Sequence, residues 1–402
     1  MRAVRWSVRG LVGVLLLTAV GCGAEDAGPL DPVVGSAPTA FYSTSPESLA
    51  GEHGSVIKTQ PLTGAPAIPG ARNQLVLYRS VDAQGKPVAV SGLLAVPAGT
   101  PPAGGWPLIS WAPGTTGVAD KCAASRDDRD SSPVRDLQAK WIAAGYAVAQ
   151  TDYQGLGTAG EHGYLIGETE QRAVADMATA ARSVDSSVGR RWVAMGHSQG
   201  GHAALFAASA ATAWAPRSEL LGVVALAPAA HLGEQVRVAK LAAASPVGGL
   251  GAGDLAVFVP LLVRGAQTVG SLDTSRFLTD KASSLLPLAD SECTGGLRDK
   301  NRWGGLSPRD VFTKNADLGD FLRVLDTNDP SSLRFDVPVM VRQGGRDLTA
   351  TPQSTEAMLG ELKLRGQHVD YEKYDGVDHG GILAASYDDV RAWVDARFGI
   401  SR

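Results

Sequence analysis

Short apolar runs that alternate with helical stretches constrain the fold of this chain more than any other feature. The runs, each short enough for a strand buried on both faces, cover residues 106–112, 146–152, 192–196, 221–227, 337–343 and 368–374. The helical stretches cover residues 134–144, 168–187, 200–214, 352–365 and 381–398. A hairpin pattern over 73–80 and 86–96, with a turn at 82–85, precedes them. This order predicts an α/β fold: a mainly parallel central sheet with helices on both faces.

Residues 231–333 interrupt the alternation. A structureless loop of that length is improbable in a compact domain, so we expect a mostly helical cap inserted over the carboxyl edge of the sheet. The core of the fold is then divided into 63–230 and 334–402. The apolar run 255–263 inside the cap either buries the cap's own helix or lines a substrate pocket.

The amino terminus has the pattern of an export signal. Three arginines precede an apolar run at 11–20 that is too short to span a bilayer, and small residues follow it, so residues 1–22 are expected to be a signal peptide. The run ends in a lipobox-like sequence at Cys22, which predicts lipidation of that cysteine and a membrane-anchored lipoprotein; ordinary cleavage would release a secreted protein instead. Residues 23–62, rich in Gly, Ala, Pro and Ser at their start, are expected to be a flexible tether.

Cysteine usage agrees with export. Besides Cys22 the chain contains only Cys122 and Cys293, and a pair in an oxidising compartment predicts one disulfide, with two buried thiols as the alternative. The net charge of -4 gives no electrostatic reason for nucleic acid as a partner.

A candidate nucleophile lies at the junction of a predicted strand and a predicted helix. Gly196-His197-Ser198-Gln199-Gly200 matches the G-x-S-x-G elbow, follows the apolar run 192–195 and precedes an alanine-rich helix. The glycines are required because Ser198 occupies a strained turn, and side chains two positions away would collide with the neighbouring strand and helix.

A serine hydroxyl is a weak nucleophile, so it needs a base and an acid that orients the base. Of the seven histidines, His379 lies in the loop before the terminal helix, where this kind of fold delivers its base. Asp347 follows the strand at 337–343, and the order Ser198, Asp347, His379 is the expected one. Asp375 is the second choice for the acid, and Asp378 is more simply a loop-forming residue.

The intermediate of such chemistry carries negative charge that backbone N–H groups must meet. Gln199, directly after the nucleophile, is expected to give one donor. The glycine-containing loop at 113–117 is expected to give the other, from Thr115 or else Thr116; a plain turn would fit the loop equally well.

Taken together, these segments resemble the secretory lipase family, the lipase A-like α/β-hydrolases of actinobacteria and fungi. The matching segments are residues 112–117 with Cys122, 152–157 with Tyr164 and Leu165, 196–201, 345–347 and His379. Pro113 departs from the pattern, because relatives often have histidine there. The resemblance implies an α/β-hydrolase fold, hydrolysis of acyl esters, a cap that forms an acyl-binding cleft, and no cofactor.

The sequence therefore predicts an exported serine esterase or lipase that acts on acyl esters. Feruloyl, tannin-type or polyester substrates, or a peptide amide, fit the same chemistry, and a non-catalytic surface binding protein on the same scaffold is the alternative of a different class. Tyr153, beside the expected nucleophile, either contacts the substrate or packs over its own loop.

Overall fold

A mixed sheet organises the chain in the computed structural model, which describes residues 33–34, 39–127, 132–244 and 255–401. Its strands, in spatial order, are β1 (Val33–Val34), β2 (Val56–Thr63), β3 (Ala71–Val81), β4 (Pro87–Pro97), β6 (Ala147–Thr151), β5 (Trp106–Ala112), β7 (Val188–His197), β8 (Glu219–Leu226), β9 (Val339–Gly344) and β10 (Val369–Tyr374). The contacts from β2 through β4 to β6 are antiparallel, and from β6 onward all neighbours are parallel. The predicted α/β-hydrolase architecture is confirmed.

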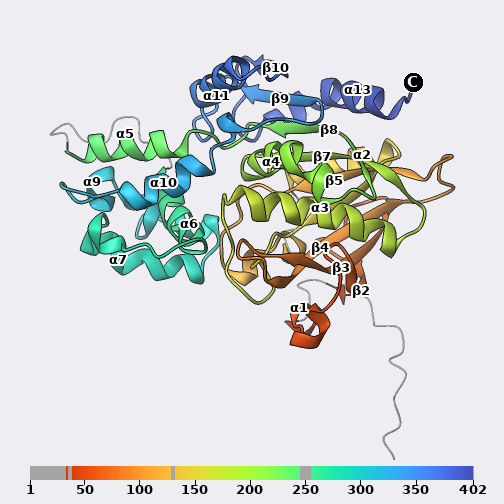
Figure 1. The fold of residues 1–402 in the computed structure, drawn as a ribbon, viewed down its shortest axis with the longest axis horizontal. Coiled ribbons are helices and arrows are strands. Elements are labelled where there is room, and N and C mark those ends of the chain that lie inside the picture. Colours follow the sequence, from red (N-terminus) through yellow and green to blue (C-terminus); the bar gives the residue numbers. More distant parts are fainter. Residues whose placement is uncertain (1–32, 35–38, 128–131, 245–254, 402) are drawn as a thin grey trace, which may run out of the picture. The chain divides into compact units, whose positions relative to one another are not determined.

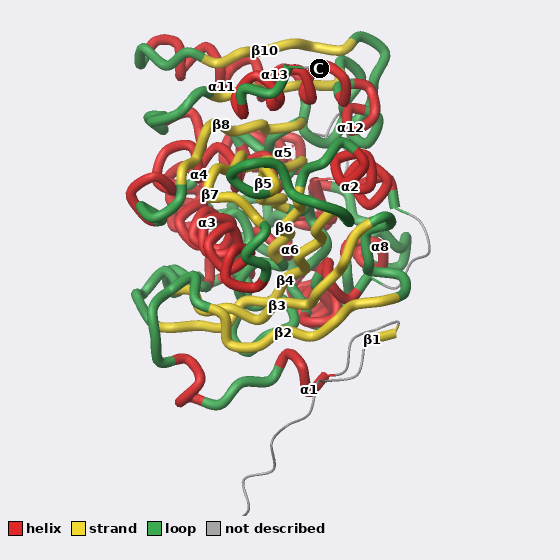
Figure 2. The backbone as a smooth tube through the Cα atoms, turned by 90° about the vertical axis from the view of Figure 1, so that its right-hand side faces the viewer, coloured by secondary structure: helices red, strands yellow, loops and turns green. Residues whose placement is uncertain are grey.

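Helices cover both faces of this sheet (Figure 1 and Figure 2). One face packs against α3 (Gly167–Val184), α4 (Gln199–Trp214) and α11 (Pro352–Leu364). The other packs against α2 (Pro133–Ala143), α12 (Ile382–Ala385) and α13 (Tyr387–Phe398). Successive strand residues alternate between the two cores: Val76 belongs to the first, and Leu75 and Leu77 belong to the second. Strands buried on both faces explain the uninterrupted apolar runs in the sequence.

Among its described residues, the insertion between β8 and β9 forms helices joined by loops, with one isolated bridge between Leu278 and Phe312. It contains α5 (Leu232–Ala244), α6 (Leu255–Gln267), α7 (Asp280–Leu285), α8 (Thr294–Leu297), α9 (Pro308–Val311) and α10 (Gly319–Thr327), with short 3-10 turns at Thr274–Arg276, Leu286–Asp290, Trp303–Gly305 and Pro330–Ser332. It has a hydrophobic core of its own, in which Phe277 stacks on Phe321 with ring centroids 5.3 Å apart. This cap lies beside the sheet in Figure 1.

The expectation of a flexible tether up to residue 62 is wrong for its second half. Residues after 38 form α1 (Thr39–Tyr42), a 3-10 turn (Pro46–Leu49) and β2, which pairs with β3. Phe41 and Tyr42 are buried in the sheet's second core, and the Tyr42 hydroxyl bonds that of Ser125 at 2.9 Å. These aromatic anchors make the segment part of the fold. The predicted signal peptide and Cys22 lie outside the described residues.

Candidate active site

The elbow at Ser198 has the strained backbone that its motif predicted. Ser198 joins β7 to α4 with φ 60° and ψ -117°, a conformation that side chains rarely adopt. Its amide donates to the carbonyl of Leu226 at 2.9 Å, which fixes the turn against the next strand. A methyl group at Gly196 would lie 2.1 Å from the carbonyl oxygen of Gly200, and one at Gly200 would lie 1.8 Å from that of Ala112. Only glycine fits at either position.

His379 and Asp347 come together from neighbouring loops. Nδ1 of His379 lies 2.7 Å from Oδ2 of Asp347, whose side chain is fully buried. The other carboxylate oxygen accepts the amides of Thr349 at 2.8 Å and Ala350 at 2.9 Å, and Gln343 donates to Oδ2 at 3.1 Å. Asp347 is therefore an oriented acceptor that requires the proton of His379 to sit on Nδ1, which leaves Nε2 as the basic nitrogen.

The side chain of His197, the residue before the nucleophile, supports the loop that contains His379. His197 donates from Nε2 to the carbonyl oxygen of His379 at 2.7 Å, and the two imidazole rings lie 4.5 Å apart. Burial, with the neighbouring His379, lowers the pKa of His197 to about 4, so His197 is a neutral support. Among the described residues, Ser198 and His379 share no hydrogen bond; such bonds are often loose in unliganded enzymes and tighten when substrate binds.

In the part of the chain that the structure describes, neither alternative acid orients the ring of His379. Asp375 is exposed and makes no contact with the ring of His379 among the described hydrogen bonds. Asp378 accepts the amide of Gly381 at 2.7 Å and so shapes the loop.

The loop after β5 lies against the elbow. A methyl group at Gly114 would be 3.2 Å from the carbonyl oxygen of His197 and 3.7 Å from Cβ of Ser198. Thr115, the next residue, lines the same cavity as Ser198, and its hydroxyl bonds that of Tyr164 at 2.9 Å. Thr116 instead accepts the amide of Thr294 from the cap at 2.8 Å. Gln199 is the first residue of α4, where backbone N–H groups have no partner within the helix.

Tyr153 supports this loop from behind. Its side chain is 2% exposed, it is not among the residues that line the cavity, and its hydroxyl donates to the carbonyl of Pro113 at 2.8 Å. These contacts favour the packing role that was its alternative, and the substrate-binding role of Tyr153 stays a prediction.

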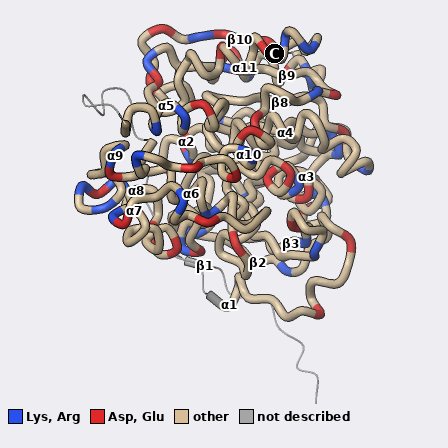
Figure 3. Tube along the Cα trace, turned by 60° about the vertical axis from the view of Figure 1, so that its left-hand side comes forward, with Lys and Arg blue, Asp and Glu red and all other residues tan. Residues whose placement is uncertain are grey.

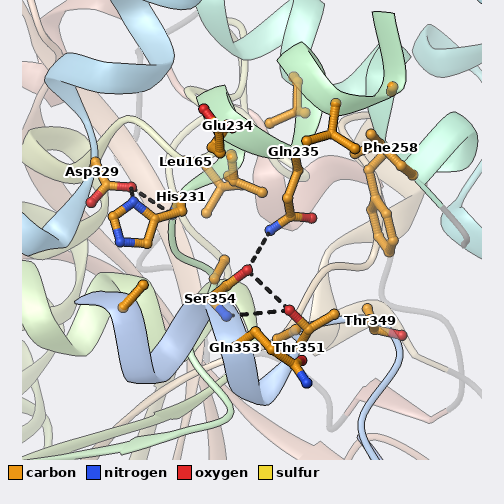
Figure 4. Close-up of a pocket in the computed structure, with 18 of the residues that line it drawn as sticks. Leu165, His231, Glu234, Gln235, Phe258, Asp329, Thr349, Thr351, Gln353 and Ser354 are labelled. Atoms are coloured by element: carbon orange, nitrogen blue, oxygen red, sulfur yellow. Dashed lines mark hydrogen bonds and ion pairs between the residues drawn. The ribbon is translucent and has the colours of Figure 1, made fainter. Parts of the chain in front are cut away.

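A cavity of about 750 Å³ opens at Ser198 between the cap and the core. Its apolar lining includes Leu165, Leu255, Phe258 and Leu262. Helix α6 thus both lines the cavity and packs the cap, since Val257, Val259 and Val263 are buried in the cap core. The opposite part of the lining is polar: Figure 4 shows Gln235 of α5 reaching toward Ser354 of α11, with the two side chains 3.5 Å apart.

A disulfide ties the cap to the loop beside the nucleophile. Cys122 and Cys293 are bonded with Cα atoms 5.5 Å apart, and Gly117 forms an isolated bridge with Cys293. None of the described helices is long and apolar enough to cross a membrane. In the described part of the chain, His, Cys, Asp and Glu side chains form no group of three that could hold a metal ion. Acidic and basic residues are interspersed along the chain in Figure 3.

Comparison with known proteins agrees with these features. The sequence profile of the secretory lipase family matches residues 137–259. The predicted resemblance to the secretory lipases is confirmed. That match, together with the disulfide, indicates an exported lipid or ester hydrolase. No curated protein matches the sequence.

Two solved structures show the same fold at low identity. The rice cell wall degrading esterase LipA from Xanthomonas oryzae is 19% identical with a TM-score of 0.68, and the match covers 86% of this chain and 98% of that one. Lipase A from Candida antarctica is 16% identical with a TM-score of 0.70, over 90% of this chain and 86% of that one.

Sequence reasoning missed a buried polar cluster behind the elbow. Glu170 of α3 is 1% exposed and contacts both Gln199 and His202. The signal was present: Glu170 continues the apolar helix face of Ala173, Val174 and Met177, where a charged residue needs a buried partner.

Proposed function

We propose that the protein is a serine carboxyl-ester hydrolase in which Ser198, His379 and Asp347 form the triad. The observation that supports it most is the 2.7 Å contact between His379 and a fully buried Asp347, beside a serine held in a strained elbow. Two alternative acids near the histidine make no such contact.

The proposed reaction follows from these positions. Nε2 of His379 takes the hydroxyl proton as Oγ of Ser198 attacks the ester carbonyl. The amides of Gln199 and Thr115 stabilise the oxyanion of the tetrahedral intermediate. The protonated imidazole then gives its proton to the alcohol oxygen as the ester C–O bond breaks. The alcohol departs, and the acyl group stays bonded to Ser198. His379 then takes a proton from water as the water attacks the acyl carbonyl. The imidazolium returns that proton to Oγ of Ser198 as the acyl–oxygen bond breaks, and the carboxylic acid is released.

The substrates proposed are acyl esters with an apolar acyl chain, because the cavity at Ser198 is apolar on the α6 side. Feruloyl, tannin-type or polyester substrates are the alternatives. They are retained because the chain is similar in fold to a cell wall degrading esterase. A series of p-nitrophenyl esters from acetate to palmitate, with methyl ferulate, distinguishes these classes by kcat/KM.

The serine mechanism is tested by Ser198→Ala, with Ser354→Ala as the matched control because both hydroxyls line the cavity. We expect Ser198→Ala to lose at least about 10⁴-fold in kcat while the fold persists, and Ser354→Ala to stay within 10-fold of wild type. Ester turnover at the wild-type rate in Ser198→Ala would refute the mechanism. Specific ester binding without turnover by the wild-type protein would favour the non-catalytic binding function.

We also propose that Cys22 carries a lipid that anchors the exported protein to a membrane. Metabolic labelling with a palmitate analogue is expected to tag the wild-type chain and not Cys22→Ala. Equal labelling of both would refute the anchor.

A further inference from the structure

A buried carboxylate behind the elbow joins three segments that surround the proposed oxyanion hole. One oxygen of Glu170 accepts the backbone amide of Leu165 at 3.0 Å and the side-chain amide of Gln199 at 2.8 Å. The other oxygen lies 2.7 Å from Nδ1 of His202, on the first turn of α4. Both side chains of this last pair are 1% exposed. Three contacts to one buried carboxylate indicate a specific role.

The partners of His202 determine its protonation. Nδ1 faces the Glu170 carboxylate, and Nε2 faces the backbone carbonyl of Asn328 at 2.8 Å. A carbonyl only accepts, so Nε2 carries a proton; with Glu170 ionised, Nδ1 donates as well and the ring is an imidazolium. Burial opposes the charge, but the carboxylate of Glu170 and the carbonyl of Asn328 outweigh it and raise the pKa of His202. Glu170 and His202 are therefore a buried ion pair.

The side chain of Gln199 is fixed by two acceptors. Its amide nitrogen lies 2.8 Å from Glu170 and 3.0 Å from Nε2 of His162. An amide nitrogen only donates, so His162 accepts there and donates from Nδ1 to the carbonyl of Gln154 at 2.9 Å. Burial lowers the pKa of His162, which agrees with this neutral tautomer. The residue whose backbone amide is the proposed first oxyanion donor therefore has its side chain held by two hydrogen bonds.

The second donor is tied to the same carboxylate by a short path. Glu170 accepts the amide of Leu165, which has a positive φ of 56°. The preceding Tyr164 bonds the hydroxyl of Thr115 at 2.9 Å. Glu170 is thus linked to Gln199 directly and to Thr115 through the 164–165 turn.

We propose that Glu170 is a positioning residue: it holds the backbone amides of the two oxyanion donors, Gln199 and Thr115, in the relative positions that the oxyanion requires. This rests on the proposed ester hydrolysis. Glu170 touches neither substrate nor reacting atoms; it acts through the two donors, and His202 balances its charge.

Helix α3 supplies a matched control. Asp176 is a second fully buried carboxylate on the same helix, and it lies 2.6 Å from Nδ1 of His53. It also accepts from Ser80 at 2.7 Å and from Trp214 at 2.9 Å. Trp214 is the last residue of α4, so this pair lies at the end of α4 opposite to the elbow.

The experiment compares Glu170→Ala with Asp176→Ala, using p-nitrophenyl butyrate and counting active sites by titration with an organophosphate. Both variants lose a buried carboxylate that faces a histidine, so both are expected to unfold at lower urea concentration. Only Glu170→Ala is expected to lower kcat per titrated site, by at least about 10-fold, with KM within twofold of wild type. Glu170→Gln keeps an acceptor for Gln199 but loses the charge that faces His202, so it is expected to lower kcat per titrated site by about three- to fivefold, less than Glu170→Ala.

Two results separate the possible failures. Equal kcat per titrated site in the two alanine variants would overturn the positioning role. Absence of ester turnover by the wild-type protein would instead overturn the proposed function. If Glu170→Ala does not fold, Glu170→Gln is compared with Asp176→Asn: a kcat lowered at least threefold in Glu170→Gln alone supports the role, and equal kcat in both overturns it.

Discussion

Removing the disulfide between Cys122 and Cys293 is expected to destabilise the protein strongly, because the bond closes a long loop. The two cysteines are 171 positions apart. In the chain-entropy model a loop of that size removes about 17 cal/mol/K from the unfolded state, which is about 5 kcal/mol at 25 °C. That is a large part of the 5 to 15 kcal/mol typical of native proteins. The variant Cys122→Ala/Cys293→Ala measures this quantity without adding buried hydroxyl groups.

The assay is urea unfolding followed by tryptophan fluorescence. We expect the free energy of unfolding of the double variant to fall by about 5 kcal/mol, and each single variant to behave in the same way because either breaks the bridge. Hydrogen exchange should also rise at the amide of Thr294, which donates to the carbonyl of Thr116 at 2.8 Å beside the bridge between Gly117 and Cys293. A double variant within about 1 kcal/mol of the oxidised wild type would refute the loop-closure reasoning.

Two further substitutions test the packing and the charges. Gly200→Ala places a methyl group 1.8 Å from the carbonyl oxygen of Ala112 and is expected to cost more than about 3 kcal/mol in urea unfolding; Gly360→Ala, with nothing within 4 Å on a helix, is expected to gain up to about 1 kcal/mol. Similar unfolding of both would contradict the elbow geometry. The hydrogen bond to Asp176 raises the pKa of His53, so this pair stabilises the fold below pH 6.5 and loses that effect as pH rises through the raised value. Because His53 is 38% exposed, the gain is below about 1 kcal/mol, and the stability gap between wild type and His53→Gln should be larger at pH 5 than at pH 9; an equal gap would contradict it.

The sheet and the elbow were predictable because their physical requirements leave local marks on the sequence. Strands buried on both faces need uninterrupted apolar runs, and β5 covers the residues that its run predicted. The elbow needs glycine at positions 196 and 200, where any side chain would meet backbone atoms. Such constraints are satisfied within a few residues and can be recognised without the rest of the fold.

Other elements depend on contacts that are remote in the sequence. Strand β2 is mostly half-buried and contains Pro61, so it lacks the alternation that marks a strand. It is ordered because β3 pairs with it. Similarly, the apolar helix face around Glu170 indicates its burial, but its partners come from α4 and from the 164–165 turn and cannot be identified from the local sequence.

The choice of the catalytic acid also depends on contacts that are remote in the sequence. Asp347 and Asp375 both follow a strand and precede His379, so their sequence contexts differ little. Their difference is spatial: the strand β9 ends beneath the histidine, and Asp347 receives two backbone amides that orient it.

Phosphonate labelling tests the central claim most directly. The wild-type protein is treated with a p-nitrophenyl phosphonate, digested and analysed by mass spectrometry, in parallel with His379→Ala. The account predicts one phosphonylated site, on the oxygen of Ser198, and a labelling rate at least about 10³-fold lower in His379→Ala. Labelling at another residue, or at an unchanged rate without His379, would contradict it.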